Sequence, residues 1–141
     1  MIEAPKVSET DCAYLAALLD TSGRVRVIRE KRNGSVYRTL FLRIGGLTKD
    51  LASWVFSKFG PGRCETTPEG VEITYVSRAA AEICVHAYPY VRSFKERARL
   101  VTRFAASMSA KRTPLGPENV AIRAEVDREL QALDRAGRGR R

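Results

Sequence analysis

Histidine and cysteine, the residues that build most zinc sites, are scarce in this sequence of 141 residues. There is one histidine, His86, and the three cysteines (Cys12, Cys64 and Cys84) lie too far apart to form a paired-ligand motif. A zinc centre is therefore not expected. An odd number of widely separated cysteines is typical of reduced thiols, and we predict a cytoplasmic protein.

Long apolar runs and an excess of acidic residues are also lacking. No run approaches the ~20 apolar residues that span a bilayer, and the first ten residues, MIEAPKVSET, lack the apolar core of a signal peptide. We therefore predict neither a membrane span nor a secretion signal. Lys and Arg number 25 against 16 Asp and Glu, a formal net charge of +9. This excess indicates a polyanionic partner, either nucleic acid or an anionic membrane surface.

The sequence does contain an ordered succession of helix and strand patterns. We predict helices over about 10–20, 49–59, 78–88 and 91–107, and strands over about 24–31, 36–44, 63–67 and 71–77. Asn33-Gly34 is a strong hairpin signal. The inward face of the second hairpin stays open between Ile73/Tyr75 and Thr74/Val76. The order α-β-β-α-β-β-α-α predicts an α+β domain.

This predicted domain covers residues 1–110 and is followed by a linker, KRTPLGP, over 111–117. Residues 118–141 are predicted to form an amphipathic helix that ends in a basic tail, GRGRR. The apolar stripe of this helix consists of Ile122, Val126, Leu130 and Leu133.

The segment LAALLDTSG, from Leu15 to Gly23, ends the first predicted helix. Position by position it resembles the signature helix of the LAGLIDADG homing-endonuclease family, and Pro89-Tyr90-Val91 resembles the family's Pro-aromatic-aliphatic segment. The resemblance covers residues 10 to 108 and implies a saddle-shaped antiparallel sheet with helices behind it. Because there is one copy of the motif, it also implies a homodimer whose signature helices pack together. The implied interface residues are Leu15, Ala16, Ala17 and Leu19.

The resemblance also implies that the outer face of the sheet lies in the major groove of duplex DNA, where arginine can bind guanine or phosphate. Alternation places Arg24, Arg26, Ile28 and Glu30 of one strand and Tyr37, Thr39, Phe41 and Arg43 of the next on this face. Lys31, Arg32 and Arg38, near the hairpin tip or on the opposite face, and Arg63 of the second hairpin are further candidates for DNA contact. A register error of one residue would reverse every side chain.

Cleavage by the family depends on an acid just before the final glycine of the motif, which holds divalent metal ions. The residue at this position is Ser22, and a neutral hydroxyl does not replace a carboxylate as a ligand of Mg²⁺. Asp20 lies two residues earlier and points to another face of the helix. The position of the family's supporting lysine is Phe94. The resemblance therefore implies no catalytic residue, no bound metal and no cofactor.

We expect a catalytically degenerate homodimer that binds duplex DNA with sequence preference, either a regulator or the relic of a homing element. One alternative is an active homing endonuclease that uses Mg²⁺ through Asp20. Another is an intron maturase that binds RNA through the same basic surface, and a fourth is a structural module without a nucleic-acid partner. No membrane partner is expected, and His86 is assigned a structural or surface role.

Overall fold

The computed structural model describes residues 7–108 and 116–138, which form four strands and five helices. In chain order these are α1 (Glu9–Ser22), β1 (Gly23–Arg32), β2 (Ser35–Leu47), α2 (Lys49–Phe59), β3 (Arg63–Thr67), β4 (Gly70–Val76), α3 (Arg78–Ala87), α4 (Lys95–Ala106) and α5 (Pro117–Arg138). The predicted α+β order is confirmed. Helix α5 begins inside the predicted linker, most of which lies outside the described residues, as do the last three residues of the basic tail.

Local signals explain where the first helices begin and where the first hairpin turns. Ser8 caps α1 through a reciprocal pair of 3.1 Å hydrogen bonds with Asp11, and Thr48 caps α2 by accepting from the Leu51 N–H at 3.2 Å. Asn33 and Gly34 both have positive φ, 50° and 80°, as a tight two-residue hairpin turn requires. Helix α4 begins at Lys95, four residues later than the predicted Val91, because the segment before it forms a turn.

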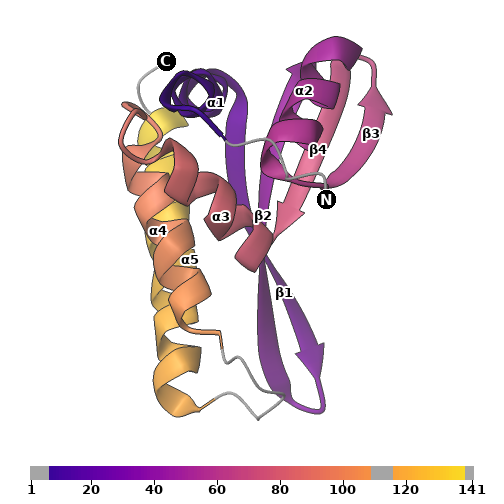
Figure 1. Ribbon diagram of the computed structural model, residues 1–141. Helices are drawn as coiled ribbons and strands as arrows, with labels where there is room; N and C mark the ends of the chain where they lie inside the picture. The colour runs from indigo at the N-terminus through magenta and orange to yellow at the C-terminus, as the bar shows by residue number, and fades with distance from the viewer. Residues whose placement is uncertain (1–6, 109–115, 139–141) are drawn as a thin grey trace, which may run out of the picture.

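The strands form one antiparallel sheet in the order β1-β2-β4-β3, and Figure 1 shows α1, α3, α4 and α5 gathered on one side of it. The core lies between these layers. It receives Leu40, Leu42 and Ile44 of β2, all fully buried. The open question about the second hairpin is answered by Ile73 and Tyr75, which are the buried residues of β4.

Tyr75 shows how completely this face of the sheet is covered. Its side chain is 2% exposed, and its hydroxyl donates to the Gly60 carbonyl at 3.0 Å. Burial raises the pKa of the Tyr75 hydroxyl to about 12. No helix in the two described ranges is long and apolar enough to cross a membrane.

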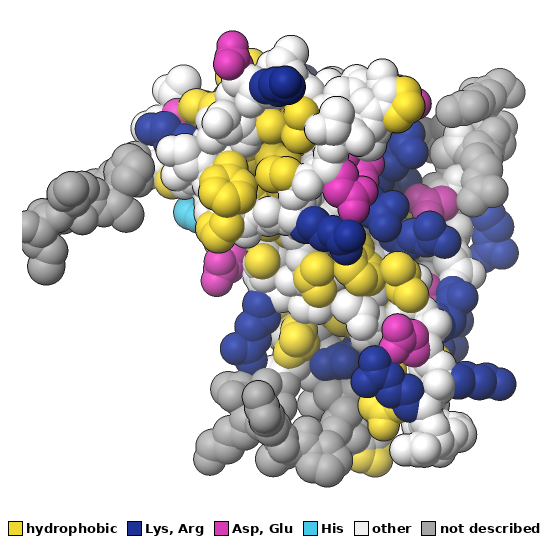
Figure 2. Space-filling view, turned by 90° about the vertical axis from the view of Figure 1, so that its right-hand side faces the viewer, with side chains coloured by type: hydrophobic (Ala, Val, Ile, Leu, Met, Phe, Trp, Pro, Cys, Tyr) yellow, Lys and Arg dark blue, Asp and Glu magenta, His cyan; other side chains and the backbone are white. Residues whose placement is uncertain are grey.

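The opposite face of the sheet carries the alternate residues of each strand. Figure 2 shows the molecule from the side on which the sheet lies in Figure 1, and many Lys and Arg side chains gather in its lower half, at the height of the β1–β2 hairpin. Hydrophobic side chains lie towards the upper left of the same view and in a band across its middle. The strand alternation therefore separates a buried apolar face from an exposed face on which basic and apolar side chains lie together.

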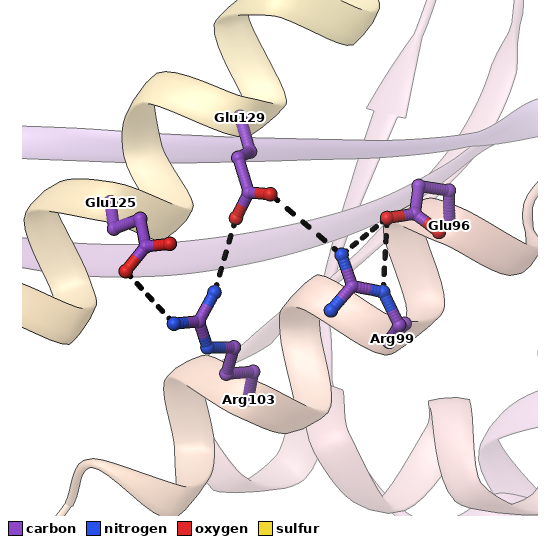
Figure 3. A network of polar contacts seen from close by, with 5 residues as sticks. All are labelled: Glu96, Arg99, Arg103, Glu125 and Glu129. Atoms are coloured by element: carbon purple, nitrogen blue, oxygen red, sulfur yellow. Dashed lines mark hydrogen bonds and ion pairs between the residues drawn. The ribbon is translucent and has the colours of Figure 1, made fainter.

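Helix α5 packs against α4 and β1, and its predicted apolar stripe is confirmed by Val126, fully buried, and Leu130, 4% exposed, which belong to the same core as the sheet. Charged pairs hold α5 along its length. Figure 3 shows α4 arginines reaching α5 glutamates: Arg103 lies 2.8 Å from Glu125 and 3.2 Å from Glu129. Arg99 pairs with Glu96 within α4 and lies 3.8 Å from Glu129.

A buried carboxylate completes the attachment of α5 to the sheet. Asp127 is 4% exposed and accepts from Arg29 of β1 at 2.6 and 3.0 Å, and from Arg38 of β2 at 3.2 Å. The amide of Gln131 donates to the same carboxylate at 3.0 Å. One aspartate therefore pairs with two sheet arginines on the helix-covered face, and it fixes α5 against the first hairpin.

Replacing Asp127 with alanine should lower the free energy of unfolding by about 1–3 kcal/mol, because two guanidinium groups lose a buried partner while Arg29 remains partly solvated. Urea unfolding followed by circular dichroism measures the change. The matched control is Asp134→Ala on the same helix, whose carboxylate side chain is 46% exposed beside Arg97, and which should cost at most about 1 kcal/mol. Equal costs for the two variants would contradict a special role for Asp127.

Candidate nucleic-acid interface

The predicted basic face is built by the pairing of β1 with β2. In this register Arg24 lies opposite Arg43, Arg26 opposite Phe41, Ile28 opposite Thr39, and Glu30 opposite Tyr37. Their neighbours Val25 and Leu42 form another opposed pair, and both are buried in the core. Side chains alternate along a strand, so the eight predicted residues point together to the face opposite the helices. The alternation predicted from the sequence is confirmed.

Three arginines of this face, Arg24, Arg26 and Arg43, have no acidic side chain within 4.0 Å among the residues that the structure describes. Nearer the hairpin tip, Arg32 pairs with Glu30 at 2.7 Å and lies 5.8 Å from the centre of the Tyr37 ring. The uncompensated charge is therefore concentrated at the end of the hairpin close to α1. A surface of this kind attracts polyanions.

The other predicted contact residues are distributed differently. Arg38 lies on the helix-covered face with its side chain 20% exposed and bound to Asp127, so it is not part of the exposed basic face. By the strand alternation Lys31 lies on the same side of the sheet as Arg38, but it is exposed because it lies at the hairpin tip. Arg63 is exposed on β3 and pairs with Glu65 at 3.1 Å. Arg63 is the register partner of Thr74 on β4, and Thr74 is in turn the partner of Arg43, which is paired with Arg24. These four residues therefore form one row across the sheet.

The carboxylate of Asp20, near the end of α1, accepts hydrogen bonds from three groups of the chain itself. It accepts from the backbone N–H of Arg92 at 3.1 Å, from that of Phe94 at 2.9 Å, and from the Ser93 hydroxyl at 3.3 Å. These donors belong to the turn that leads into α4. Asp20 therefore joins the end of α1 to the start of α4, and its oxygens are directed to this turn.

Phe94 fills the space beside Asp20. It is 3% exposed, and a Cβ added to Gly23 would lie 3.0 Å from its ring and 2.7 Å from the Leu19 carbonyl oxygen. Glycine at position 23 therefore allows α1 to pass directly into β1 against this ring. The neighbouring Lys95 turns away, with its ammonium 5.3 Å from the centre of the Tyr88 ring. Neither residue presents an ammonium group at the end of α1.

Ser22 opens onto a cavity of about 270 Å³ that includes two glutamates the sequence did not predict. The cavity lies between the end of α1 and the second hairpin, which contributes Glu69 and Glu72, and Arg24 and Arg43 also line it. The two glutamates were missed because their hairpin carries no recognisable motif and only the pairing of β4 with β2 brings them here. Within the described ranges there is no group of three or more His, Cys, Asp and Glu side chains arranged to hold a metal ion.

Solved structures with the same arrangement identify the fold. I-CvuI, a homing endonuclease solved with DNA, superposes with a TM-score of 0.73 at 15% identity, covering 89% of this chain and 82% of that one. I-Vdi141I, an archaeal intron-encoded homing endonuclease solved with DNA, gives 0.73 at 10% identity, with 89% and 84% covered. I-TnaI, a homing endonuclease, gives 0.66 at 14% identity, with 97% and 100% covered. The chain has the homing-endonuclease fold.

This likeness is one of structure. No protein-family model matches the sequence, and no curated protein is significantly similar to it. At 10 to 15% identity the backbone arrangement is shared while most side chains differ. The functional residues of this homing-endonuclease fold must therefore be judged position by position.

Helix α1, which contains the segment LAALLDTSG, has one buried side and one exposed side. Leu15, Ala16 and Leu19, three of the four predicted interface residues, are 0 to 1% exposed within the chain's own core. Of the four only Ala17 is exposed, on the same side of α1 as the exposed Ala13 and Thr21. The sequence could not separate the two sides because α1 is apolar all round. Leu15, Ala16 and Leu19 therefore pack into the core of the chain itself.

The single histidine lies on α3, away from the end of α1. His86 is exposed, and its ring meets that of Phe59 edge to face with 5.5 Å between the centroids. The aromatic contacts continue from Phe59 to Trp54 at 5.7 Å and from Trp54 to Tyr14 at 5.1 Å. His86 therefore packs at the end of an aromatic row that joins α3, α2 and α1.

Proposed function

We propose that this protein binds duplex DNA with sequence preference and does not cut it. The observation that carries the proposal is the exposed face of β1 and β2, where Arg24, Arg26 and Arg43 have no acidic partner within 4.0 Å in the described part of the chain. Phosphates and guanine edges are the acceptors that such arginines match. The homing endonucleases I-CvuI and I-Vdi141I, which share the fold, were solved with DNA.

The residues at the end of α1 support the loss of cleavage. Ser22 stands where the family carries its metal-binding acid, and Phe94, buried, stands where it carries a lysine. Asp20, which could be imagined as a substitute ligand, already accepts from three groups of the turn before α4. A carboxylate that accepts from two backbone N–H groups and a hydroxyl is poorly available to a cation. The proposed role is therefore that of a regulator or of a homing-element relic.

Selection of bound duplexes from a random library tests this function directly. The wild-type protein should enrich a defined, nearly palindromic site, and Arg26→Ala should lose preference at one position per half-site, because a bidentate arginine–guanine contact is worth about 1–3 kcal/mol of discrimination. Arg128→Ala, an exposed arginine of α5, is the charge-matched control and should enrich the wild-type site. Preferential recovery of structured RNA in a parallel competition would instead favour the maturase function.

A homodimer is part of the proposal, formed through the exposed side of α1. Ala13, Ala17 and Thr21 follow one another at intervals of four residues, so small side chains line one side of the helix and permit close approach of a second copy. The half-buried Leu18 borders this stripe. A two-fold arrangement would place two basic faces side by side on one duplex.

Ala17→Leu should weaken this dimer by about 1–3 kcal/mol, because the added methyl groups push the two helices apart. Sedimentation equilibrium of the wild-type and variant proteins measures the dissociation constant. Ala132→Leu makes the same change at an exposed position of α5 and should leave the constant unchanged. A wild-type protein that stays monomeric at high concentration would remove the dimer from the proposal. Ala16, which is 1% exposed, is unsuitable for this test because a larger side chain there would disturb the core.

A further inference from the structure

Two arginines face each other directly across the β1–β2 pair. Arg24 and Arg43 are register partners and point to the same exposed face. Residues opposed in this way have Cβ atoms about 5 Å apart, and like charges at this position repel each other. No carboxylate lies within 4.0 Å of either residue in the ranges 7–108 and 116–138. The pair therefore costs the fold stability unless an anion lies between or beside the two guanidinium groups.

One donor of this pair is already removed from water without a partner. The Nε of Arg43 is buried, and no hydrogen-bond acceptor reaches it from the described residues. Buried charged donors are rarely left unsatisfied, because losing a hydrogen bond to a charged group costs more than losing a neutral one. In the same structure Arg29, Arg38 and Arg103 all have carboxylate partners. The unused donor at Arg43 marks a place for an acceptor from outside the chain.

The surrounding cavities show on which side this acceptor fits. A cavity of about 730 Å³ at the free edge of β1 is lined by Arg24, Arg26, Arg43 and Arg97, with Asp134 as its acidic side chain. Asp134 is bound to Arg97 at 3.2 Å. The cavity beside Ser22 has two carboxylates instead, Glu69 and Glu72. Four guanidinium groups against one carboxylate make the first cavity the one that attracts an anion.

We propose that Arg24 and Arg43, with Arg97 of α4 beside them, form a phosphate-binding site. Guanidinium groups bind phosphate oxygens through paired, charge-assisted hydrogen bonds, and one phosphate group relieves the repulsion of the Arg24–Arg43 pair while it satisfies the buried Nε. The natural ligand of this site would be a backbone phosphate of the bound duplex, and this assignment rests on the proposed function. It neutralises that phosphate with side chains, so binding at this point needs no divalent cation.

Thermal unfolding with inorganic pyrophosphate tests the site without DNA. The wild-type midpoint should rise with pyrophosphate concentration, since a ligand of the native state stabilises it in proportion to its occupancy. Arg43→Met and Arg24→Met should each abolish the rise. Arg99→Met is the control: it removes one arginine charge from α4 at a residue already paired with Glu96, and it should keep the rise. An equal rise in the Arg24→Met and wild-type proteins would overturn the site, and because Arg24 is exposed this variant does not disturb the core.

Duplexes with single neutral methylphosphonate linkages test the natural ligand. A linkage in one half-site should weaken wild-type binding by about 10- to 100-fold, the usual worth of a charged hydrogen bond, and should have no further effect on Arg24→Met. Loss of affinity by the same factor in both proteins would overturn the assignment to a backbone phosphate. If the wild-type protein binds no duplex while pyrophosphate still stabilises it, the proposed function fails and the phosphate site stands.

Discussion

Affinity for duplex DNA should fall by about three orders of magnitude between 50 and 200 mM salt. Arg24, Arg26 and Arg43 of the basic face have no acidic side chain within 4.0 Å among the described residues, so the proposed dimer brings about six arginine charges to the duplex, and charges in this number release enough counterions for a loss of that size. Fluorescence anisotropy at a series of KCl concentrations measures the effect. A plot of log K against log salt should have a slope of about −5.

Variants of two neighbouring arginines separate this prediction from a general effect of charge. Arg26→Ala removes two positive charges from the DNA-facing side of the proposed dimer and should make the slope shallower by about 2. Arg38→Ala removes the same formal charge from the adjacent strand, but its guanidinium lies on the helix-covered face bound to Asp127, so the slope should stay unchanged. A slope near zero for the wild-type protein, or equal changes in the two variants, would mean that DNA is not bound through this face.

The register of this face was predictable from the sequence because two independent local signals agree. Alternating apolar residues fix which side chains of β1 and β2 turn inwards, and Asn33-Gly34 fixes the length of the turn that joins them. The second hairpin lacked such agreement, since both of its faces carry residues that could be buried. Tertiary packing determines which face of this hairpin turns inwards. The Tyr75 hydroxyl donates to the carbonyl of Gly60, a contact between distant residues that no local sequence pattern predicts.

Contacts between distant parts of the chain account for what the sequence did not show. In the sequence Arg29 and Arg38 have no evident acidic partner. In the structure α5 places Asp127 beside both of them, although Asp127 lies 98 residues from Arg29 and 89 from Arg38 along the chain. Arg97 becomes part of the basic cavity in the same way, because α4 and α5 meet the free edge of β1. Charge composition therefore predicts a basic protein, while the folded chain decides which arginines remain available.

The same distinction applies to the motif at the end of α1. The resemblance places an acid position at Ser22 and a lysine position at Phe94, and both departures were visible in the sequence. That Asp20 anchors the turn before α4 depends on three donors more than 70 residues away. Its assignment as a structural group is therefore a result of the fold, and it bears directly on catalysis.

Purified protein with Mg²⁺ should leave its bound duplex intact while still shifting it in a gel. Two Ser22 hydroxyls at the axis of the proposed dimer provide no negative field to hold divalent cations, and the ring of Phe94 provides no ammonium to stabilise developing charge. One preorganised stabilising group is worth about 10²–10³ in rate, so losing both should slow cleavage by about 10⁴-fold or more. Incubation of labelled, selected duplex with Mg²⁺ or Mn²⁺, against an EDTA control, measures the rate.

Restoring the missing groups tests the reason for this inactivity. Ser22→Asp should recover weak metal binding, measurable by calorimetry, and Ser22→Asp with Phe94→Lys should recover slow nicking if the double variant still folds. Folding must be checked by circular dichroism, since replacing a buried aromatic ring costs about 3–5 kcal/mol. Cleavage by the wild-type protein would contradict the prediction, and two further variants would then locate the chemistry. Loss of that activity in Glu72→Gln but not in Asp20→Asn would assign it to the cavity beside Ser22, where Glu69 and Glu72 supply the carboxylates that the signature helix lacks.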